Sequence, residues 1–168
     1  MTERIRLTVA QAVVKFLARQ YSERDGVQRR LIEGCFGIFG HGNIAGLGQA
    51  LMQMQSEVEG DVEALRYFQC RDEQAMVHPA VGFSRLRSRL QTMACTSSVG
   101  PGATNLVTGA ALATINRIPV LLLSGDVFAT RSSDTVLQQL ESPRGHDISV
   151  SNTLRPVSVF FDRVWRPE

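Results

Sequence analysis

Residues 90–125, LQTMACTSSVGPGATNLVTGAALATINRIPVLLLSG, contain the pattern that decides the fold. Two apolar runs, LQTMACTS and IPVLLLSG, enclose a segment of small and apolar residues, 101–114, that starts with proline. Proline suits a first helical position, because its missing N–H would have no partner there in any helix. Apolar runs without polar alternation are typical of strands buried on both faces of a parallel sheet. The stretch therefore predicts two parallel strands joined by a helix.

The same order of strand and helix continues toward the N-terminus. The apolar runs GCFGIFG at 34–40 and RYFQC at 66–70 predict two further strands, and the segments that follow them, 42–54 and 72–86, predict helices. Alternation of this kind indicates an α/β fold, in which a parallel sheet is covered by helices on both faces.

The first thirty residues precede this alternation. Residues 8–21 carry apolar side chains at helical spacing and predict a helix, with Thr8 as its N-cap. The charged segment 22–30 is expected to be a loop.

Beyond Phe128 the alternation fades. A long surface loop is expected at 138–139 and 142–146, and PVSVFFDRV at 156–164 is expected to form one further strand or to start a helix. The chain ends in WRPE without a cap or a polar tail. We therefore expect residues 1–168 to be a single domain from the N-terminal part of a longer protein.

Composition narrows the class of protein. The chain has 168 residues, of which 43% are hydrophobic and 20% charged, as in one compact domain. A net charge of +2 is too small to indicate a nucleic-acid partner. The three cysteines, Cys35, Cys70 and Cys95, form no CxxC pair, which favours reduced thiols in a reducing compartment. With no signal peptide and no apolar run of roughly 18 residues, we expect a cytoplasmic protein without a membrane span.

Distinctive residues follow the predicted strands, at the edge where ligands bind to parallel sheets. Gly40, Gly42 and Gly46 open a helix after the first strand, in a GxGxxxG pattern that resembles a dinucleotide fingerprint or merely permits a tight turn. A second glycine turn, Gly100-Pro101-Gly102, follows the third strand. A site lined by two such loops suggests a larger and flatter ligand.

Glu73 follows the second strand and allows two interpretations. An acid near a helix start complements the helix dipole, a stabilisation of about 0.3–1 kcal/mol. Asp72 can serve that helix start as N-cap, however, and the residues after Glu73 are mostly apolar. A carboxyl group in apolar surroundings holds its proton more tightly and can share a hydrogen with a ligand nitrogen. The histidines show no metal-ligand spacing, so no metal site is expected within this chain.

Three blocks of the chain together resemble a known family. DEQAM, TSSVGPGATNLVTGAALATINRIPVLLLSGD and the continuation FATR…VLQQLE resemble the N-terminal, pyrimidine-binding domain of thiamine-diphosphate enzymes of the acetohydroxyacid-synthase group. The resemblance covers residues 7–166. Within this group, FGHGN and VLQQLE are most similar to the hydrolases that open the ring of a cyclic dione in myo-inositol breakdown.

The resemblance implies which residues bind the cofactor, thiamine diphosphate. The glutamate that matches Glu73 hydrogen-bonds N1′ of the aminopyrimidine ring and favours the tautomer that activates the cofactor. Pro101 and Asn105 match positions beside the cofactor, and Gln138 matches a glutamine that reaches the same site. These residues and Gly42 are therefore expected to form the cofactor site.

The resemblance also implies a reaction. His41 and Asn43 would lie near the reacting carbonyl, so they are expected to handle protons and to be catalytic together with Glu73. The substrate would be a small cyclic dione, and ring opening with water would give an open-chain 5-deoxy-glucuronic acid.

The family's other parts are missing from this sequence. In the family, the diphosphate and Mg²⁺ bind to a C-terminal domain with a GDG…N pattern, and a middle domain precedes it. Family active sites form between subunits, so we expect a dimer or tetramer and an inactive isolated chain. Pro79 also departs from the family pattern, and a proline inside a helix costs about 3 kcal/mol or kinks it. The geometry around Glu73 depends on how that helix accommodates Pro79.

Three other functions are compatible with the sequence. The chain resembles acetolactate-synthase-like carboligases through the same blocks. A nicotinamide-binding module would use Asp72 or Glu73 to bind a ribose. A non-catalytic interaction domain would use the glycine loops as a docking surface for another protein.

Overall fold

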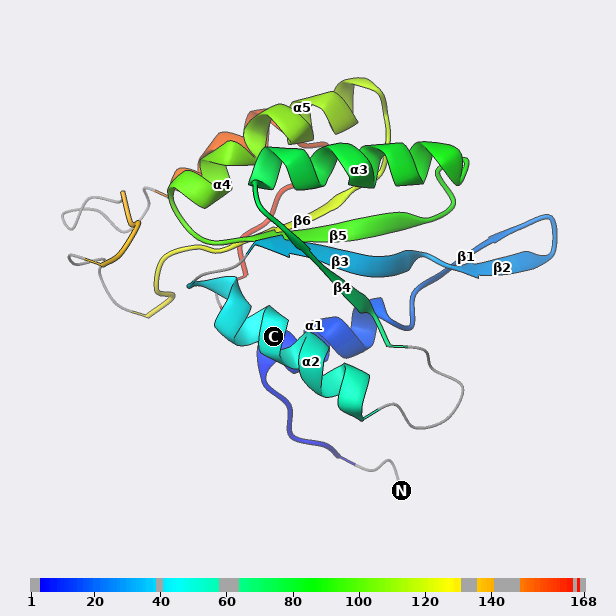
Figure 1. The fold of residues 1–168 in the computed structure, drawn as a ribbon, viewed down its shortest axis with the longest axis horizontal. Helices are drawn as coiled ribbons and strands as arrows, with labels where there is room; N and C mark the ends of the chain where they lie inside the picture. The colour runs from blue at the N-terminus through cyan, green and yellow to red at the C-terminus, as the bar shows by residue number, and fades with distance from the viewer. Residues whose placement is uncertain are drawn as a thin grey trace.

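The structure is a computed structural model that describes residues 4–38, 41–57, 64–130, 136–140, 149–164 and 166. Four strands form a parallel sheet in the order β4-β3-β5-β6 (Figure 1). Their bounds are β3 Ile32–Ile38, β4 Arg66–Cys70, β5 Thr92–Ser97 and β6 Leu121–Ser124. This arrangement confirms the α/β class and the parallel sheet, and β4 matches the predicted strand RYFQC at both ends.

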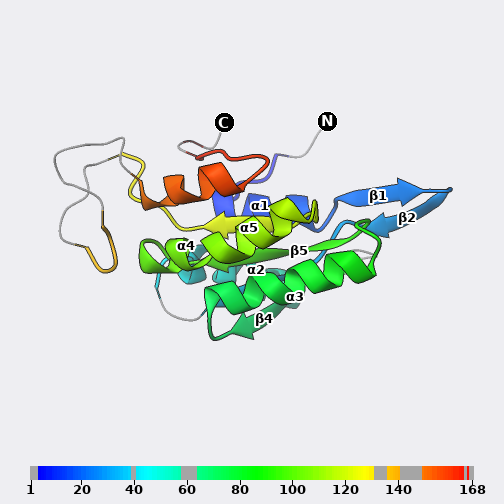
Figure 2. The ribbon, with the colours of Figure 1, turned by 90° about the horizontal axis from the view of Figure 1, so that it is seen from above.

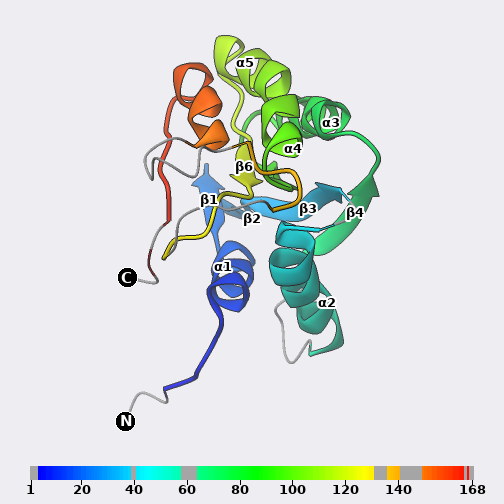
Figure 3. The same ribbon diagram turned by 90° about the vertical axis from the view of Figure 1, so that its left-hand side faces the viewer.

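Helices cover both faces of the sheet, as predicted. The helices are α1 Val9–Leu17, η1 Ile44–Gly48, α2 Gln49–Ser56, α3 Glu73–Leu86, α4 Pro101–Asn105, α5 Val107–Ile115 and η2 Val150–Val157. Figure 3 shows α1 and α2 on one face, and α3, α4, α5 and η2 on the other. Thr8 is the N-cap of α1, as expected, and completes a capping box with Gln11.

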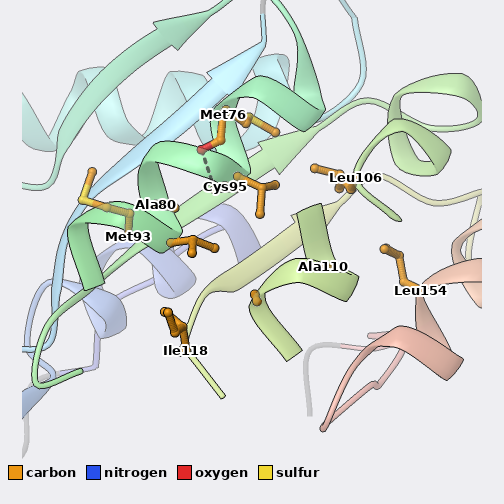
Figure 4. Packing of buried hydrophobic residues seen from close by; sticks show 11 residues of the cluster. Met76, Ala80, Met93, Cys95, Leu106, Ala110, Ile118 and Leu154 are labelled. Carbon is orange, nitrogen blue, oxygen red and sulfur yellow. Dashed lines mark hydrogen bonds between the residues drawn. The ribbon is translucent and has the colours of Figure 1, made fainter. Parts of the chain in front are cut away.

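The two layers of helices bury the central strand β5 completely. Every residue of β5 is buried, because its side chains alternate between two apolar clusters. Cys95 packs with α3 and α5 on one face, and Ala94 packs with α1 and α2 on the other. Figure 4 shows the first cluster, in which the Cys95 thiol approaches the Met76 carbonyl oxygen at 3.8 Å. This double burial is the reason that the strand reads as an unbroken apolar run.

Segment 22–30 is a β-hairpin and not the expected loop. Strands β1 (Tyr21–Arg24) and β2 (Val27–Arg30) pair antiparallel and project from the body of the domain (Figure 2). The turn residues Asp25 and Gly26 both have positive φ, 56° and 75°. An Asp-Gly pair at such a turn is a strong hairpin signal that the charged side chains around it obscured.

Three other predicted elements need correction. The predicted helix 101–114 is two helices, α4 and α5, with Leu106 between them. The fourth strand is shorter than the run IPVLLLSG and begins only at Leu121. Residues 156–164 form no strand: Pro156 and Val157 end the 3₁₀ helix η2. Of the expected loop, Gln138 and Gln139 lie outside any helix or strand, as predicted, and 142–146 lies outside the described residues.

Pro79 lies inside α3, and the helix continues through it to Leu86. A proline at this position removes the hydrogen bond to the carbonyl of Ala75, four residues earlier. Both Pro79 and Ala75 are exposed, so water can satisfy that carbonyl. The first turn of α3, which carries Glu73, therefore keeps its helical geometry.

Candidate functional site

The loops at the carboxyl ends of the strands meet around Ser98, which is only 6% exposed. Three glycines lie against it. A Cβ on Gly42 would stand 3.2 Å from the Ser98 Cβ, one on Gly102 would stand 2.5 Å from Ser98 Oγ, and one on Gly125 would stand 3.1 Å from the Ser98 carbonyl carbon. Larger residues at these positions would separate the loops. The glycines therefore bring the ends of β3, β5 and β6 into contact.

Glu73 is the first residue of α3, and its half-buried carboxylate lies against α4. Asn105 Nδ2 donates a hydrogen bond to Glu73 Oε2 at 2.9 Å. The other oxygen, Oε1, faces Gly102, where a Cβ would stand 3.0 Å away. Within the part of the chain that the structure describes, no group donates a hydrogen bond to Oε1. One oxygen is thus held by the protein, and the other is available to a ligand.

Asp72 is the N-cap of α3, as the sequence predicted. Its Oδ1 accepts a hydrogen bond from the Ala75 N–H at 2.7 Å, and its Oδ2 accepts one from Asn105 Nδ2 at 2.9 Å. These hydrogen bonds, the Ala75 one first, hold the pKa of Asp72 below its ordinary value. Asn105 therefore links two neighbouring carboxylates with one amide group.

The apolar residues that follow Glu73 were expected to line its carboxyl group. Met76, Val77 and Ala80, at positions i+3, i+4 and i+7 from Glu73, lie on the same side of α3 and are buried in the core beneath it. Glu73 stands at the start of this side, in the first turn of the helix, where it is half-buried. The carboxylate also has polar and backbone neighbours that the sequence did not indicate, Asn105 and Gly102.

His41 and Gln138 lie at the same edge of the sheet, on neighbouring segments. His41 Nε2 is 3.1 Å from the carbonyl oxygen of Leu137, so this ring nitrogen carries the hydrogen. Ser98 Oγ donates to Gln138 Oε1 at 3.1 Å. Gly100, with φ of 61°, lies so close to the Gln138 carbonyl oxygen that a Cβ would overlap it. The segment 136–140 is thus seated on the second glycine turn.

Asn43 is tied into the sheet. Its side-chain nitrogen donates to Thr96 Oγ1 at 3.2 Å and to the Leu123 carbonyl oxygen at 2.9 Å. Both hydrogens of the amide are therefore used to join the loop after β3 to β5 and β6. This geometry shows a structural function for Asn43 and leaves its predicted proton handling untested.

The remaining predicted residues occupy different places. Pro101 is the exposed first residue of α4, where proline is favourable. Gly42 has φ of 80° and packs on Ser98. Gly46, the third glycine of the GxGxxxG pattern, faces Ala10 of α1, and Gly40 lies outside the described residues.

Sequence reasoning missed Ser98 and the bond between Asp72 and Asn105. Ser98 stands two residues before the glycine turn, at the carboxyl end of a buried strand, and this position was the available signal. The Asp72–Asn105 bond joins residues 33 positions apart and has no local signature.

The described residues show no disulfide, no helix long and apolar enough to cross a membrane, and no group of three or more potential metal-ligating side chains. All three cysteines are free. Burial raises the pKa of Cys35 to about 12 and, with smaller contributions from neighbouring cysteines, raises that of Cys95.

Comparisons with known proteins agree with this architecture. Residues 27–145 match the family model of the thiamine pyrophosphate enzyme, N-terminal TPP binding domain. The chain is 56% identical over 164 residues to a 3D-(3,5/4)-trihydroxycyclohexane-1,2-dione hydrolase of Geobacillus thermodenitrificans (strain NG80-2). It is 54% identical over 164 residues to a protein of the same name from Bacillus thuringiensis (strain Al Hakam). Both alignments cover 98% of this chain but only 25% and 24% of the relatives, so the chain spans about a quarter of their length.

Proposed function

The chain belongs to the thiamine pyrophosphate enzymes, as their N-terminal TPP binding domain, and we propose that it uses Glu73 to bind and activate thiamine diphosphate in a ring-opening hydrolase. The observation that carries this proposal is the unequal hydrogen bonding of the two oxygens of the Glu73 carboxylate. Asn105 holds Oε2, while Oε1 has no donor among the described residues and lies against Gly102.

The residues around Glu73 fit the pyrimidine end of such a cofactor. An aminopyrimidine ring offers nitrogens that pair with a carboxyl oxygen, and Oε1 is the oxygen available for this purpose. Gly102 allows α4 to pack closely on the carboxylate, because a Cβ there would stand only 3.0 Å from Oε1 and 2.5 Å from Ser98 Oγ. The glycine thereby fixes the position of the oxygen that we propose for the cofactor. When bound, thiamine diphosphate would supply a carbon nucleophile and an electron sink for breaking a C–C bond.

We propose that other residues of the chain hold the Glu73 carboxylate in place and orient the groups around it. Asn105 keeps the Glu73 carboxylate on one side of the site. The Nε2–H of His41 is engaged by Leu137, so in a neutral ring Nδ1 is the nitrogen that accepts a proton. We propose that His41 uses this nitrogen to move a proton near the reacting carbonyl. Gln138 accepts a hydrogen bond from Ser98 through Oε1, and we propose that it offers its NH₂ group to the cofactor.

The proposed substrate is trihydroxycyclohexane-1,2-dione. Its support is the identity of 56% over 98% of this chain to a relative whose name gives this activity. Hydrolysis would consume one water and convert the cyclic dione into open-chain 5-deoxy-glucuronic acid, as in myo-inositol breakdown. An acetolactate-synthase-like carboligase is the alternative, because it would use the same Glu73 and cofactor.

Three further features belong to this proposal. Mg²⁺ would bind with the diphosphate on residues beyond this domain, and the site would be completed by a second subunit in a dimer or tetramer. The three free cysteines fit a reducing compartment, for which we propose the cytoplasm.

The test uses the full-length enzyme that contains this chain. Thiamine diphosphate binding in the presence of Mg²⁺ is measured by calorimetry, and ring opening of the dione is followed separately, for wild type and for Glu73→Gln. Glu57→Gln is the matched control, because Glu57 is exposed at the end of α2, outside the site. We expect binding and turnover in wild type and in the control, and a loss of turnover of at least about 100-fold in Glu73→Gln.

Each result separates the alternatives. Cofactor binding without turnover of the dione would retain the role of Glu73 and favour the carboligase. Full turnover by Glu73→Gln would contradict the proposed role of this carboxylate.

A further inference from the structure

We propose that Asp72 is a positioning residue for the site: through the amide of Asn105 it determines which oxygen of Glu73 is held and which is offered to the cofactor. This inference rests on the proposed function of Glu73. It assigns to Asp72 a second function, beyond its capping of α3.

The hydrogen bonds define the orientation of Asn105 without ambiguity. The side-chain nitrogen of Asn105 lies 2.9 Å from Asp72 Oδ2 and 2.9 Å from Glu73 Oε2. An ionised carboxylate accepts hydrogen bonds and donates none. Only the NH₂ group of the amide can face two carboxylates, and its two hydrogens serve one oxygen each. The carbonyl oxygen of Asn105 is thereby directed away from Glu73.

Asp72 is itself firmly placed. Its Oδ1 accepts the Ala75 N–H at 2.7 Å, and its extended backbone, with φ of −156° and ψ of 136°, is typical of an N-cap. With Oδ1 committed to the helix, Oδ2 is fixed in direction toward Asn105. Asp72 is ionised at neutral pH, where even its ordinary pKa lies far below the pH, and its hydrogen bonds lower the pKa further, so Oδ2 acts as an acceptor.

Asp72 affects Glu73 only through the side-chain amide of Asn105. If Asp72 could no longer accept from Asn105, the amide could rotate and place its oxygen opposite Glu73 Oε2. Two oxygens would then face each other, and the Glu73 carboxylate would leave its position. Asp72 therefore prevents the orientation of Asn105 that is incompatible with an aligned Glu73.

Asp72→Asn tests this directly in the full-length enzyme. Asparagine caps a helix as well as aspartate does, so its oxygen can still accept from Ala75. Its NH₂ group would then face the NH₂ group of Asn105, and the amide of Asn105 would have to rotate. We expect kcat for ring opening to fall roughly 10- to 100-fold, the range for a hydrogen bond to a charged group. The KM for the dione should change by less than about threefold, because Asp72 is not proposed to contact the substrate.

Two measurements do not depend on turnover. The affinity of the cofactor-free enzyme for thiamine diphosphate, measured by calorimetry, should weaken at least about 10-fold in Asp72→Asn. The thermal midpoint without cofactor should stay within about 3 °C of wild type, because the cap is retained. A cap defect would produce the opposite pattern, a lower midpoint with normal affinity.

Asp72→Ser is the matched control, because serine caps equally well but presents no NH₂ group to Asn105. It should lose less activity than Asp72→Asn, since Asn105 can keep its bond to Glu73. In a double-mutant cycle, adding Asp72→Asn to Asn105→Ala should cause little further loss, because Asp72 acts through Asn105.

The outcomes are distinct. Wild-type kcat and affinity in Asp72→Asn, or losses that simply multiply in the cycle, would overturn the positioning function. Equal losses of kcat and affinity in Asp72→Ser and Asp72→Asn would indicate an effect of helix capping alone, and would overturn the positioning function as well. A full loss in Glu73→Gln beside a normal Asp72→Asn would refute this inference but leave the proposed function intact, whereas a normal Glu73→Gln would refute the proposed function itself.

Discussion

Gly102 lies directly against the carboxylate of Glu73. A Cβ on Gly102 would stand 3.0 Å from Glu73 Oε1 and 2.5 Å from Ser98 Oγ. The glycine of the second turn therefore allows α4 to approach the one oxygen of Glu73 that has no donor among the described residues. The position of the carboxylate depends on the missing side chain.

Gly102→Ala is expected to weaken thiamine diphosphate binding by about 10-fold in the full-length enzyme, because the new methyl group displaces Glu73 or Ser98 from its rotamer. Calorimetry measures the affinity. Gly82→Ala is the matched control, since Gly82 also lies in a helix but a methyl group there would meet nothing within 4 Å. That variant should bind normally and gain about 0.5–1 kcal/mol in stability. Equal affinities in the two variants would contradict the importance of this contact.

Asn43→Ala is expected to lower the free energy of unfolding by about 1–2 kcal/mol, because it removes the bonds to Thr96 and to the Leu123 carbonyl. Urea denaturation measures the change. Asn116→Ala, which removes a bond within a helix end to the Leu112 carbonyl, should cost less than about 0.5 kcal/mol. A stable Asn43→Ala enzyme without turnover would show that chemistry, and not anchoring, is the main function of Asn43.

Ser84→Ala is expected to leave stability unchanged or to raise it by up to about 1 kcal/mol. The hydroxyl of Ser84 is fully buried in α3 and has no hydrogen-bond partner among the described residues, so its removal ends an uncompensated desolvation. Ser97→Ala provides the contrast, because the equally buried Ser97 donates a hydrogen bond to the Ser98 carbonyl at 3.1 Å. This variant should lose about 1 kcal/mol of the free energy of unfolding. Urea denaturation of both variants checks the difference, and a clear loss in Ser84→Ala would be inconsistent with an unpaired hydroxyl.

Pro79→Ala is expected to raise the free energy of unfolding by about 1–3 kcal/mol, because it restores the hydrogen bond to the Ala75 carbonyl inside α3. Pro101→Ala, at the first position of α4, should bring no such gain, since that N–H has no helical partner. Thermal unfolding of the cofactor-free protein measures both. A destabilised Pro79→Ala protein would indicate that the ring stabilises the domain by other means.

Alkaline pH is expected to destabilise the domain through its buried thiols. Burial, with a smaller contribution from Cys70, raises the pKa of Cys35 from 9.0 to about 12. Above pH 9 the unfolded chain releases this proton and the folded protein does not, so stability falls between pH 9 and about 12, by up to about 1.4 kcal/mol per pH unit.

The measurement is urea denaturation as a function of pH, for wild type and for Cys35→Ala. The variant should lose some stability at every pH because of the smaller side chain, but its slope above pH 9 should be shallower. In this variant, Cys95, whose pKa is also raised by burial, should still cause part of the fall in stability above pH 9. Parallel curves for the two proteins would contradict the assignment to Cys35.

Much of the fold followed from local patterns. The apolar runs located β3, β4 and β5, and small residues after a proline located the helices that follow Gly100. The hairpin at 22–30 was missed because charged side chains were given more weight than the Asp-Gly turn. The 3₁₀ helix η2, which ends at Val157, was missed because its three-residue period differs from the patterns that indicate an α-helix or a strand.

The candidate site was recognised only in part. Glu73, Asn105 and Gly102 could be named because they stand beside strand ends and glycine turns. The buried apolar residues beside Glu73, Met76 and Val77, could be expected from their i+3 and i+4 spacing, but the hydrogen bond from Asn105 joins residues 32 positions apart and could not. The anchoring function of Asn43, whose amide hydrogens both serve the sheet, was not foreseen, and its predicted proton handling stays a prediction.

The sequence by itself determined the parallel α/β architecture, the cap at Asp72 and the placement of polar loops at one edge of the sheet. These features depend on periodicity and on neighbours a few residues apart, which a sequence displays directly. Only the tertiary structure decided which oxygen of Glu73 is held and which is available to a ligand. That choice depends on Asn105, 32 positions away, and on the close approach that Gly102 permits, because contacts between distant segments exist only once the chain has folded.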